Sequence, residues 1–183
     1  MKIAIAQWNL DDYHRMIDAG ILDDKAVELL RGNIIEKPAE TVPHAYFSTE
    51  AGEYLIFLLG QKAQVSSGKP ITLPNNSEPE PDIAIIQRLG REYLSHHPYP
   101  ENIFWVIEYA DSSLEKDTTL KYEIYAEAGI SEYWLVNLQR RELIIFRDPC
   151  EQEYRSKTTL TEGEITPIAF PDIQIEVAKI ISP

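Results

Sequence analysis

The sequence predicts an α/β fold, in which helices flank one mixed β-sheet and extra β structure follows at the C-terminus. The run Asn102 to Ala110 is apolar on both faces, which is typical of a central strand covered on both sides. Segments with helical periodicity lie before and after this run. From Tyr154 to Ile181, short pieces alternate polar and apolar residues, which indicates additional strands.

Length and composition limit the class of protein. The chain has 183 residues, of which 44% are hydrophobic and 26% charged, so we expect one globular domain over residues 23–183 after an N-terminal arm of residues 1–22. The net charge of −13 excludes a protein that coats DNA uniformly, because phosphate neutralisation needs clustered Lys and Arg. The charge leaves room for an enzyme that touches DNA locally or holds a metal with carboxylates.

Cysteine count and hydropathy bear on the compartment. Cys150 is the only cysteine, which excludes an internal disulfide and a cysteine zinc cage. The longest apolar runs are too short to span a bilayer, and residues 1–8 lack the apolar core of a secretory signal. We therefore expect a cytoplasmic protein with no membrane contact.

The first half of the chain contains two predicted helices and one strand. Two aspartates precede Lys25–Leu30 and Gly32 follows, which favours a short helix with a glycine stop. Asn33–Lys37 is a predicted strand. Aromatic and leucine side chains in Pro43–Leu59 form a broad helical stripe that ends at Gly60, which predicts a longer helix.

The second half alternates strands and helices after a loop. Prolines, glycine and asparagines interrupt Ser66–Pro81, leaving room for one short strand. Asp82–Ile86 is the next predicted strand, and a helix over Ser113–Ala128 follows the central strand. Glu132–Leu138 and Glu142–Arg147 form a predicted hairpin.

Two acids lie at the ends of apolar strands. Asp82 opens its strand directly after Pro81, and Glu108 lies near the end of the most apolar strand, on the face of Phe104 and Val106 by alternation. An ionised carboxylate is costly there unless it is paired or binds a metal. Mg²⁺ prefers such oxygen ligands. For an isolated pair of acids, the favoured interpretation is instead a turn cap at Asp82 and a lysine partner for Glu108.

The helix after Glu108 adds a cation. Asp117, Lys121 and Tyr125 are spaced i, i+4 and i+8, so they share one face. If this face points at the sheet, Lys121 reaches the acids, where a cation orients water or stabilises charge on a phosphoryl group. The alternative is a surface ion pair between Asp117 and Lys121. Two acids, a cation and a metal form a minimal set for metal-assisted phosphodiester hydrolysis.

The residues in this order resemble a bacterial family, the Uma-type restriction endonucleases of the PD-(D/E)XK nuclease superfamily. The resemblance spans about Lys25 to Leu138, and the combined order and spacing of its segments are specific. The segments are Val27-Glu28-Leu29-Leu30-Arg31-Gly32-Asn33-Ile34-Ile35-Glu36, His44, Glu78-Pro79-Glu80-Pro81-Asp82-Ile83-Ala84-Ile85-Ile86, Val106-Ile107-Glu108-Tyr109-Ala110-Asp111-Ser112-Ser113-Leu114, Asp117, Lys121, Tyr125 and Ala128-Gly129-Ile130-Ser131-Glu132-Tyr133-Trp134-Leu135-Val136-Asn137.

This resemblance implies a restriction-endonuclease-like fold and an Mg²⁺-dependent endonuclease acting on DNA, with Mn²⁺ as the alternative ion. Asp82 and Glu108 match the family's metal-binding acids, and Glu28 matches a further acid placed in an N-terminal helix. The superfamily's usual lysine position holds Ala110, and Lys121 on the following helix matches the displaced lysine. The expected catalytic set is therefore Asp82, Glu108 and Lys121, in a homodimer that has two sites for two strands.

A second interpretation keeps the fold without the catalysis. The negative charge and the lack of a recognisable DNA-reading module favour a dimeric binding or scaffold protein. His44 lies at the predicted start of a helix. Its side chain either has a structural role there or reaches the site. The basic stretch holds Arg140, Arg141, Arg147, Arg155 and Lys157. We slightly prefer a solvated hairpin face for it over a DNA contact.

Overall fold

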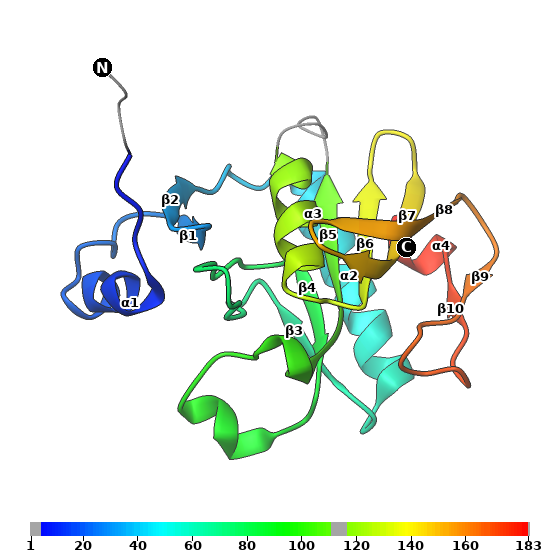
Figure 1. Ribbon diagram of the computed structural model, residues 1–183. Coiled ribbons are helices and arrows are strands. Elements are labelled where there is room, and N and C mark those ends of the chain that lie inside the picture. The colour runs from blue at the N-terminus through cyan, green and yellow to red at the C-terminus, as the bar shows by residue number, and fades with distance from the viewer. Residues whose placement is uncertain (1–4, 111–116, 183) are drawn as a thin grey trace.

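The computed structural model describes residues 5–110 and 117–182, and it confirms the α/β class. A six-stranded mixed sheet has the order β3-β4-β5-β6-β7-β8 (Figure 1). β5 and β6 are parallel, and every other neighbouring pair is antiparallel. The strands are β3 (Gln64–Ser67), β4 (Ile83–Ile86), β5 (Ile103–Ala110), β6 (Glu132–Asn137), β7 (Glu142–Cys150) and β8 (Glu153–Leu160).

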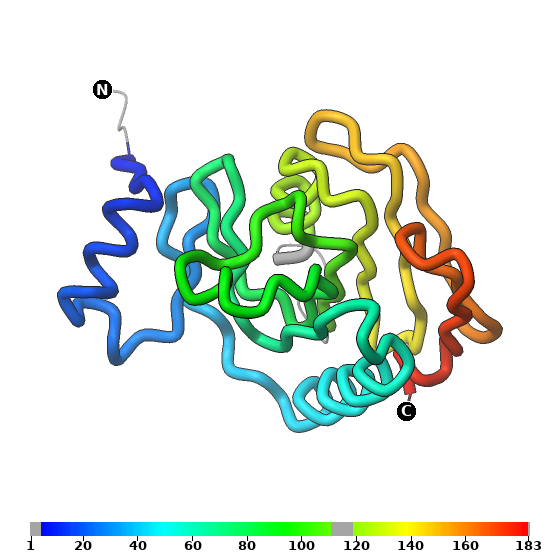
Figure 2. Tube along the Cα trace, turned by 90° about the horizontal axis from the view of Figure 1, so that it is seen from below, coloured from blue at the N-terminus to red at the C-terminus, as the bar shows by residue number. Residues whose placement is uncertain are grey.

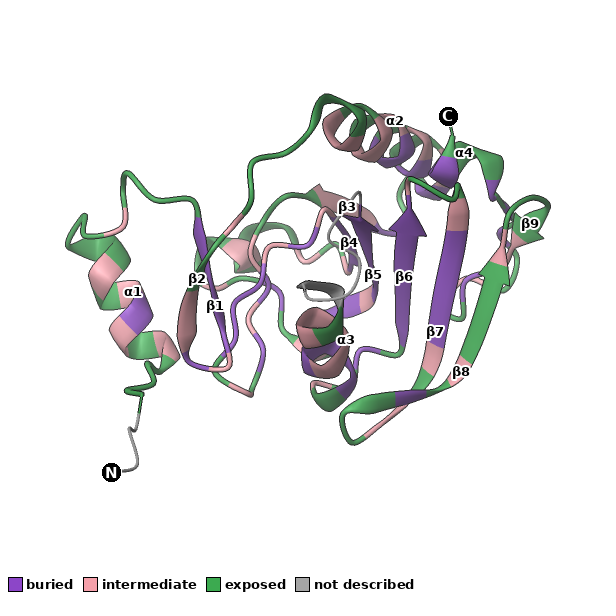
Figure 3. Cartoon of the chain, turned by 90° about the horizontal axis from the view of Figure 1, so that it is seen from above, coloured by how far each residue is buried: buried purple, intermediate pink, exposed green. Residues whose placement is uncertain are grey.

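Helices cover both faces of this sheet. Figure 3 shows α2 (Val42–Leu59) and α4 (Ala178–Ile181) on one face and α3 (Asp117–Glu127) on the other. The predicted helix over Pro43–Leu59 is confirmed. The predicted start of α3, residues 113–116, lies outside the described residues, as does the side chain of Asp117. Two 3₁₀ helices, Gly90–Leu94 and Pro100–Asn102, lie between β4 and β5.

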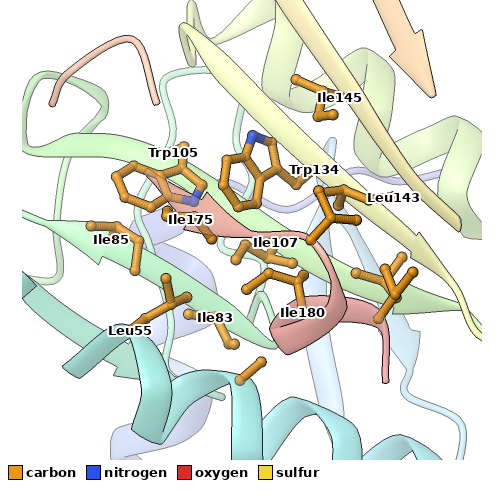
Figure 4. Close-up of a cluster of buried hydrophobic side chains, with 14 of the residues drawn as sticks. Leu55, Ile83, Ile85, Trp105, Ile107, Trp134, Leu143, Ile145, Ile175 and Ile180 are labelled. Carbon is orange, nitrogen blue, oxygen red and sulfur yellow. The ribbon is translucent and has the colours of Figure 1, made fainter. Parts of the chain in front are cut away.

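Strand alternation divides the apolar side chains between two layers. Toward α2 and α4, the core includes Trp105 and Trp134, whose ring centroids lie 5.5 Å apart (Figure 4). Toward α3, Val106 and Tyr133 pack with Tyr125. Burial of the strands on both faces explains why the central run reads as apolar without alternation. The face assignment holds for Val106, whereas Phe104 packs in the opposite layer because a bulge shifts the β4–β5 register nearby.

The N-terminal elements form a smaller group at one end of the molecule (Figure 2). They are α1 (Leu10–Asp18), β1 (Val27–Leu30) and β2 (Asn33–Glu36), and the two strands pair antiparallel. The predicted helix over Lys25–Leu30 is wrong. Arg31 (φ 47°) and Gly32 (φ 74°) both have left-handed backbone, so Gly32 serves a tight two-residue hairpin turn rather than a helix stop.

The strand identity of β1 follows from what covers it. Leu29 packs with Tyr13 of α1, and its carbonyl accepts the Glu78 N–H at 2.7 Å. A four-residue apolar segment does not reveal its period, so these distant partners decide between helix and strand. The boundary between an arm of residues 1–22 and a domain of residues 23–183 stays a prediction.

The C-terminal segment completes the layer over the two tryptophans. β9 (Glu164–Ile165) and β10 (Ile175–Glu176) pair antiparallel, which confirms extra β structure after Tyr154. α4 then buries Ile180, whose carbonyl accepts the Tyr109 hydroxyl at 3.0 Å. This contact ties the C-terminal segment to β5. Among the described helices, none combines the length and apolar character that a bilayer crossing needs.

Candidate metal and phosphodiester-cleavage site

Asp82 and Glu108 are brought to the same end of the antiparallel pair β4–β5. Ile83 pairs with Ile107, so Asp82 and Glu108 are the next residues in this register. The Asp82 Oδ2 accepts a hydrogen bond from the Tyr109 backbone N–H at 2.6 Å. This carboxylate therefore continues the hydrogen bonding between β4 and β5 at the start of β4. Both side chains line one cavity. Sheet pairing therefore joins two acids that lie 26 positions apart in the sequence.

Lys121 lies between two carboxylates. Its Nζ is 3.1 Å from Glu108 Oε1 and 3.2 Å from Glu28 Oε2. The three side chains are largely buried, which makes these contacts stronger than those of exposed pairs. The lysine face of α3 thus points toward the sheet, and the ion pair with Glu108 joins the helix to β5.

Tyr125 both packs and hydrogen-bonds. Its ring lies in the core against Tyr133, with centroids 5.3 Å apart, and its hydroxyl donates to Glu108 Oε1 at 2.6 Å. Tyr125 lies one turn of α3 after Lys121, so the hydroxyl and the ammonium group reach the same Glu108 oxygen. α3 therefore fixes the position of Glu108 through two donors.

Glu28 comes from β1 and not from a helix. Its Oε2 also accepts the Glu80 backbone N–H at 3.1 Å, so this oxygen is bonded to Lys121 and to the chain just before β4. Glu80 in turn pairs with Lys37. These contacts hold the β1–β2 hairpin against the segment that carries Asp82.

A histidine that the sequence left open also faces Asp82. His44 Nε2 lies 3.1 Å from Asp82 Oδ2, and this hydrogen bond raises the pKa of His44 above its usual value against the opposing effect of burial. The Glu40 carboxylate comes close as well: one ligand atom each of Glu40, His44 and Asp82 lies within 4.8 Å of the others. Glu40 was not expected at the site, and its only signal in the sequence is its position four residues before His44 at a helix start.

The charged groups surround a cavity of about 590 Å³. Its wall combines residues from β1, from the segment around residues 37–41, from α2 and α3, and from the β4–β5 end. The charged lining consists of Glu28, Lys37, Glu40, His44, Glu80, Asp82, Glu108 and Lys121. Acids outnumber cations in this lining, which favours a bound cation.

The pKa values of Glu108 and Lys121 both differ from their ordinary values. Burial raises the pKa of Glu108 to about 7, since the opposing effects of Lys121 and Tyr125 are partly cancelled by the neighbouring Asp82 and Glu28. Burial lowers the pKa of Lys121, but Glu108 and Glu28 raise it by more, so the net pKa lies above its usual value. Lys121 therefore remains protonated at neutral pH, while Glu108 titrates there.

This titration predicts a pH-dependent response to metal. Because Glu108 has a folded pKa of about 7 against an ordinary 4.5, its contribution to the free energy of unfolding is complete below 4.5 and falls as pH rises to about 7. A divalent ion held by this carboxylate would bind its ionised form and so would recover this loss. We expect Mg²⁺ to raise the Tm more at about pH 8 than at about pH 5.5.

Thermal unfolding at both pH values, with Mg²⁺ and with EDTA, measures this effect. In Glu108→Gln the metal-free pH dependence between these values is expected to become weaker, and the part that remains is due to His44, whose pKa is also raised. An Mg²⁺ shift in the wild type that is larger at the lower pH would contradict the assignment.

Comparisons with known proteins bear on this site. Residues 10–178 match the sequence profile of the Uma2 family, which is described as "Putative restriction endonuclease". The chain belongs to this family. The match covers β1 to β10, and so all the residues of the cavity. No curated protein matches the chain.

A solved structure supports the fold of this Uma2 member. The chain is similar to the crystal structure of a protein from Anabaena variabilis ATCC 29413 that is described as a "putative nuclease", with a TM-score of 0.74 and 16% sequence identity. The alignment covers 95% of this chain and 97% of that one. At this identity the likeness establishes a shared fold over nearly the whole length of both chains.

Proposed function

We propose that this chain is an Mg²⁺-dependent endonuclease that hydrolyses DNA phosphodiester bonds, with Mn²⁺ as a substitute ion. The observation that carries the proposal is the position of Lys121, whose ammonium group lies between Glu108 and Glu28 in the cavity that Asp82 also lines. Membership of the Uma2 family supports a nuclease.

The residues present fit a divalent ion. Asp82 and Glu108 would hold it, since both offer hard oxygen donors and line one cavity. The raised pKa of Glu108 reflects a buried carboxylate without enough positive charge nearby, which a cation would supply. Glu28 is the third acid, although its Oε2 already accepts from Lys121 and Glu80. When bound, the ion polarises a phosphoryl oxygen and lowers the pKa of a water molecule.

Lys121 acts as a charged donor and not as a base. Its raised pKa keeps the proton on Nζ at neutral pH. An ammonium group has three N–H donors, and two are directed at Glu108 and Glu28 among the described residues. We propose that the third orients the attacking water or a phosphate oxygen and stabilises the charge that develops on the phosphoryl group.

The net charge and the cavity bear on how this chain would bind and cut DNA. With a net charge of −13, DNA affinity is expected to be weak, local to the cavity and steeply salt-dependent. Because one cavity cuts one strand, we propose a homodimer for double-strand cleavage. We also propose a cytoplasmic location, where such a substrate is available in bacteria.

Cleavage of supercoiled plasmid tests the proposal. We expect the purified chain to nick or linearise the plasmid with millimolar Mg²⁺ or Mn²⁺, to be inactive with EDTA, and to slow as salt increases. If neither ion supports cleavage and neither ion changes the Tm, the nuclease proposal fails. The chain would then be a non-catalytic binding or scaffold protein.

A further inference from the structure

We propose that His44 is a metal ligand through Nε2, and that the site consequently binds a first-row transition-metal ion more tightly than Mg²⁺. The inference rests on the proposed function, because Asp82 belongs to the metal centre proposed there. It adds a nitrogen ligand, and with it a metal preference, to a site so far described by carboxylates alone.

The backbone and neighbouring rings hold the His44 side chain in place. Thr41 caps α2, and its hydroxyl oxygen accepts the His44 backbone N–H at 3.4 Å, which places His44 in the first turn of the helix. The Tyr109 ring meets the imidazole edge-on, with centroids 6.0 Å apart. Tyr109 is itself anchored by its hydroxyl bond to Ile180. The imidazole is therefore positioned before any ion binds.

Nε2 is the nitrogen that faces the cavity. Among the described residues, the buried Nδ1 of His44 has no hydrogen-bond partner, and Nε2 lies 3.1 Å from Asp82 Oδ2. Adjacent ligand atoms around a six-coordinate ion are about 3 Å apart, given metal–ligand distances of about 2.1 Å. The separation of Nε2 and Oδ2 thus matches two neighbouring ligands of one ion.

A carboxylate oxygen from the same turn completes the grouping. Glu40 lies just before the cap, and its oxygen is within 4.8 Å of the His44 and Asp82 ligand atoms. Glu40, His44 and Asp82 all line the cavity with Glu108. The metal centre would therefore also be bounded by the start of α2.

A second histidine–carboxylate pair shows the contrast. His14 Nε2 contacts both oxygens of Glu78, at 3.0 and 2.9 Å, and Glu78 Oε2 also accepts the Thr72 hydroxyl. This pair joins α1 to the segment before β4 and is absent from the cavity lining and from the metal-ligand grouping of the described residues. It provides a matched control with the same pair of chemical groups.

The nitrogen ligand determines the metal preference. Mg²⁺ binds oxygen ligands and keeps its waters, whereas imidazole suits later first-row ions such as Ni²⁺. Loss of His44 is therefore expected to weaken Ni²⁺ binding by about tenfold or more and to change Mg²⁺ binding much less.

Pulsed EPR on the Mn²⁺-loaded protein tests the proposal without an activity measurement. We expect a ¹⁴N coupling from imidazole in the wild type, replaced by a ¹⁵N coupling when histidine is labelled, and retained in His14→Gln. The coupling should vanish in His44→Gln, and titrations at about pH 8 should give the loss of Ni²⁺ affinity. If His44→Gln fails to fold, a coupling that persists in His14→Gln and in the double variant His96→Gln with His97→Gln leaves His44 as its source, because the chain has four histidines.

The outcomes separate the two proposals. If Mn²⁺ binds, depends on Asp82 and lacks histidine coupling, the His44 assignment is overturned while the carboxylate centre stands. An unchanged ratio of Ni²⁺ to Mg²⁺ affinity in a folded His44→Gln also overturns it. If neither ion binds the wild type, the His44 assignment and the proposed metal centre both fail.

Discussion

Asp82→Asn is expected to reduce metal-dependent plasmid cleavage by at least about a hundredfold, because it removes a carboxylate proposed to hold the ion. The asparagine is nearly isosteric and keeps an oxygen that can accept the Tyr109 N–H, now at 2.6 Å from Asp82 Oδ2. The fold should therefore survive, and the rise in Tm caused by Mg²⁺ should disappear. Cleavage rates and metal-dependent thermal shifts measure the two effects.

The chain contains a matched control for this substitution. Asp172 also follows a proline, but its side chain is 85% exposed and its only ion-pair partner among the described residues is Lys62, at 4.0 Å. Asp172→Asn should cleave and bind Mg²⁺ as the wild type does. Equal cleavage by Asp82→Asn and Asp172→Asn would remove Asp82 from the catalytic set.

Lys121→Met is expected to affect both stability and cleavage. Without the ammonium group, Glu28 loses its cation and the pKa of Glu108 rises further, and breaking these buried pairs costs up to about 3–5 kcal/mol in the free energy of unfolding. Mg²⁺ should recover part of this loss, since it supplies the missing positive charge. Cleavage should still fall by about a hundredfold to a thousandfold, because the donor to the phosphoryl group is gone.

Urea unfolding and plasmid cleavage measure these effects separately. Lys62→Met is the control, because the Lys62–Asp172 pair is exposed and worth less than about 1 kcal/mol. The double variant Lys121→Met with Glu28→Gln removes one unpaired carboxylate, so it should regain stability without regaining cleavage. Wild-type cleavage by Lys121→Met would contradict the proposed role of the ammonium group.

The elements that could be predicted from the sequence are those whose signal is local and long. The apolar run of β5 extends over 8 residues and the stripe of α2 lies on a helix of 18 residues, so both signals are readable without knowledge of distant contacts. The i, i+4 spacing of Lys121 and Tyr125 placed both on one face, and in the structure both contact Glu108.

The parts that could not be predicted depend on distant partners. β1 has four residues, and α1 together with the Glu78 backbone determines that it is a strand. The same hairpin brings Glu28 to Lys121 across more than ninety positions of the sequence, a contact with no local pattern. His44 and Glu40 read as ordinary helix-start residues, and only the packing of α2 beside the start of β4 brings them to Asp82.

The buried charged groups of the site lower the free energy of unfolding, and this cost in stability indicates function. Five acids and two lysines line the cavity, and burial together with the neighbouring Asp82 and Glu28 raises the pKa of Glu108 to about 7. Apolar side chains there would stabilise the chain more, because buried ion pairs rarely recover their desolvation. Such perturbed groups gathered in one cavity are typical of sites that bind a ligand or catalyse a reaction.

Anomalous diffraction from crystals soaked in Mn²⁺ tests the central claim most directly, because it locates the ion without reference to activity. The account predicts an anomalous peak in the cavity, within ligand distance of the Asp82 and Glu108 carboxylates, that is absent from Asp82→Asn crystals. A well-ordered cavity without such a peak at millimolar Mn²⁺ would contradict this claim. An ion bound at another place on the chain would contradict it as well.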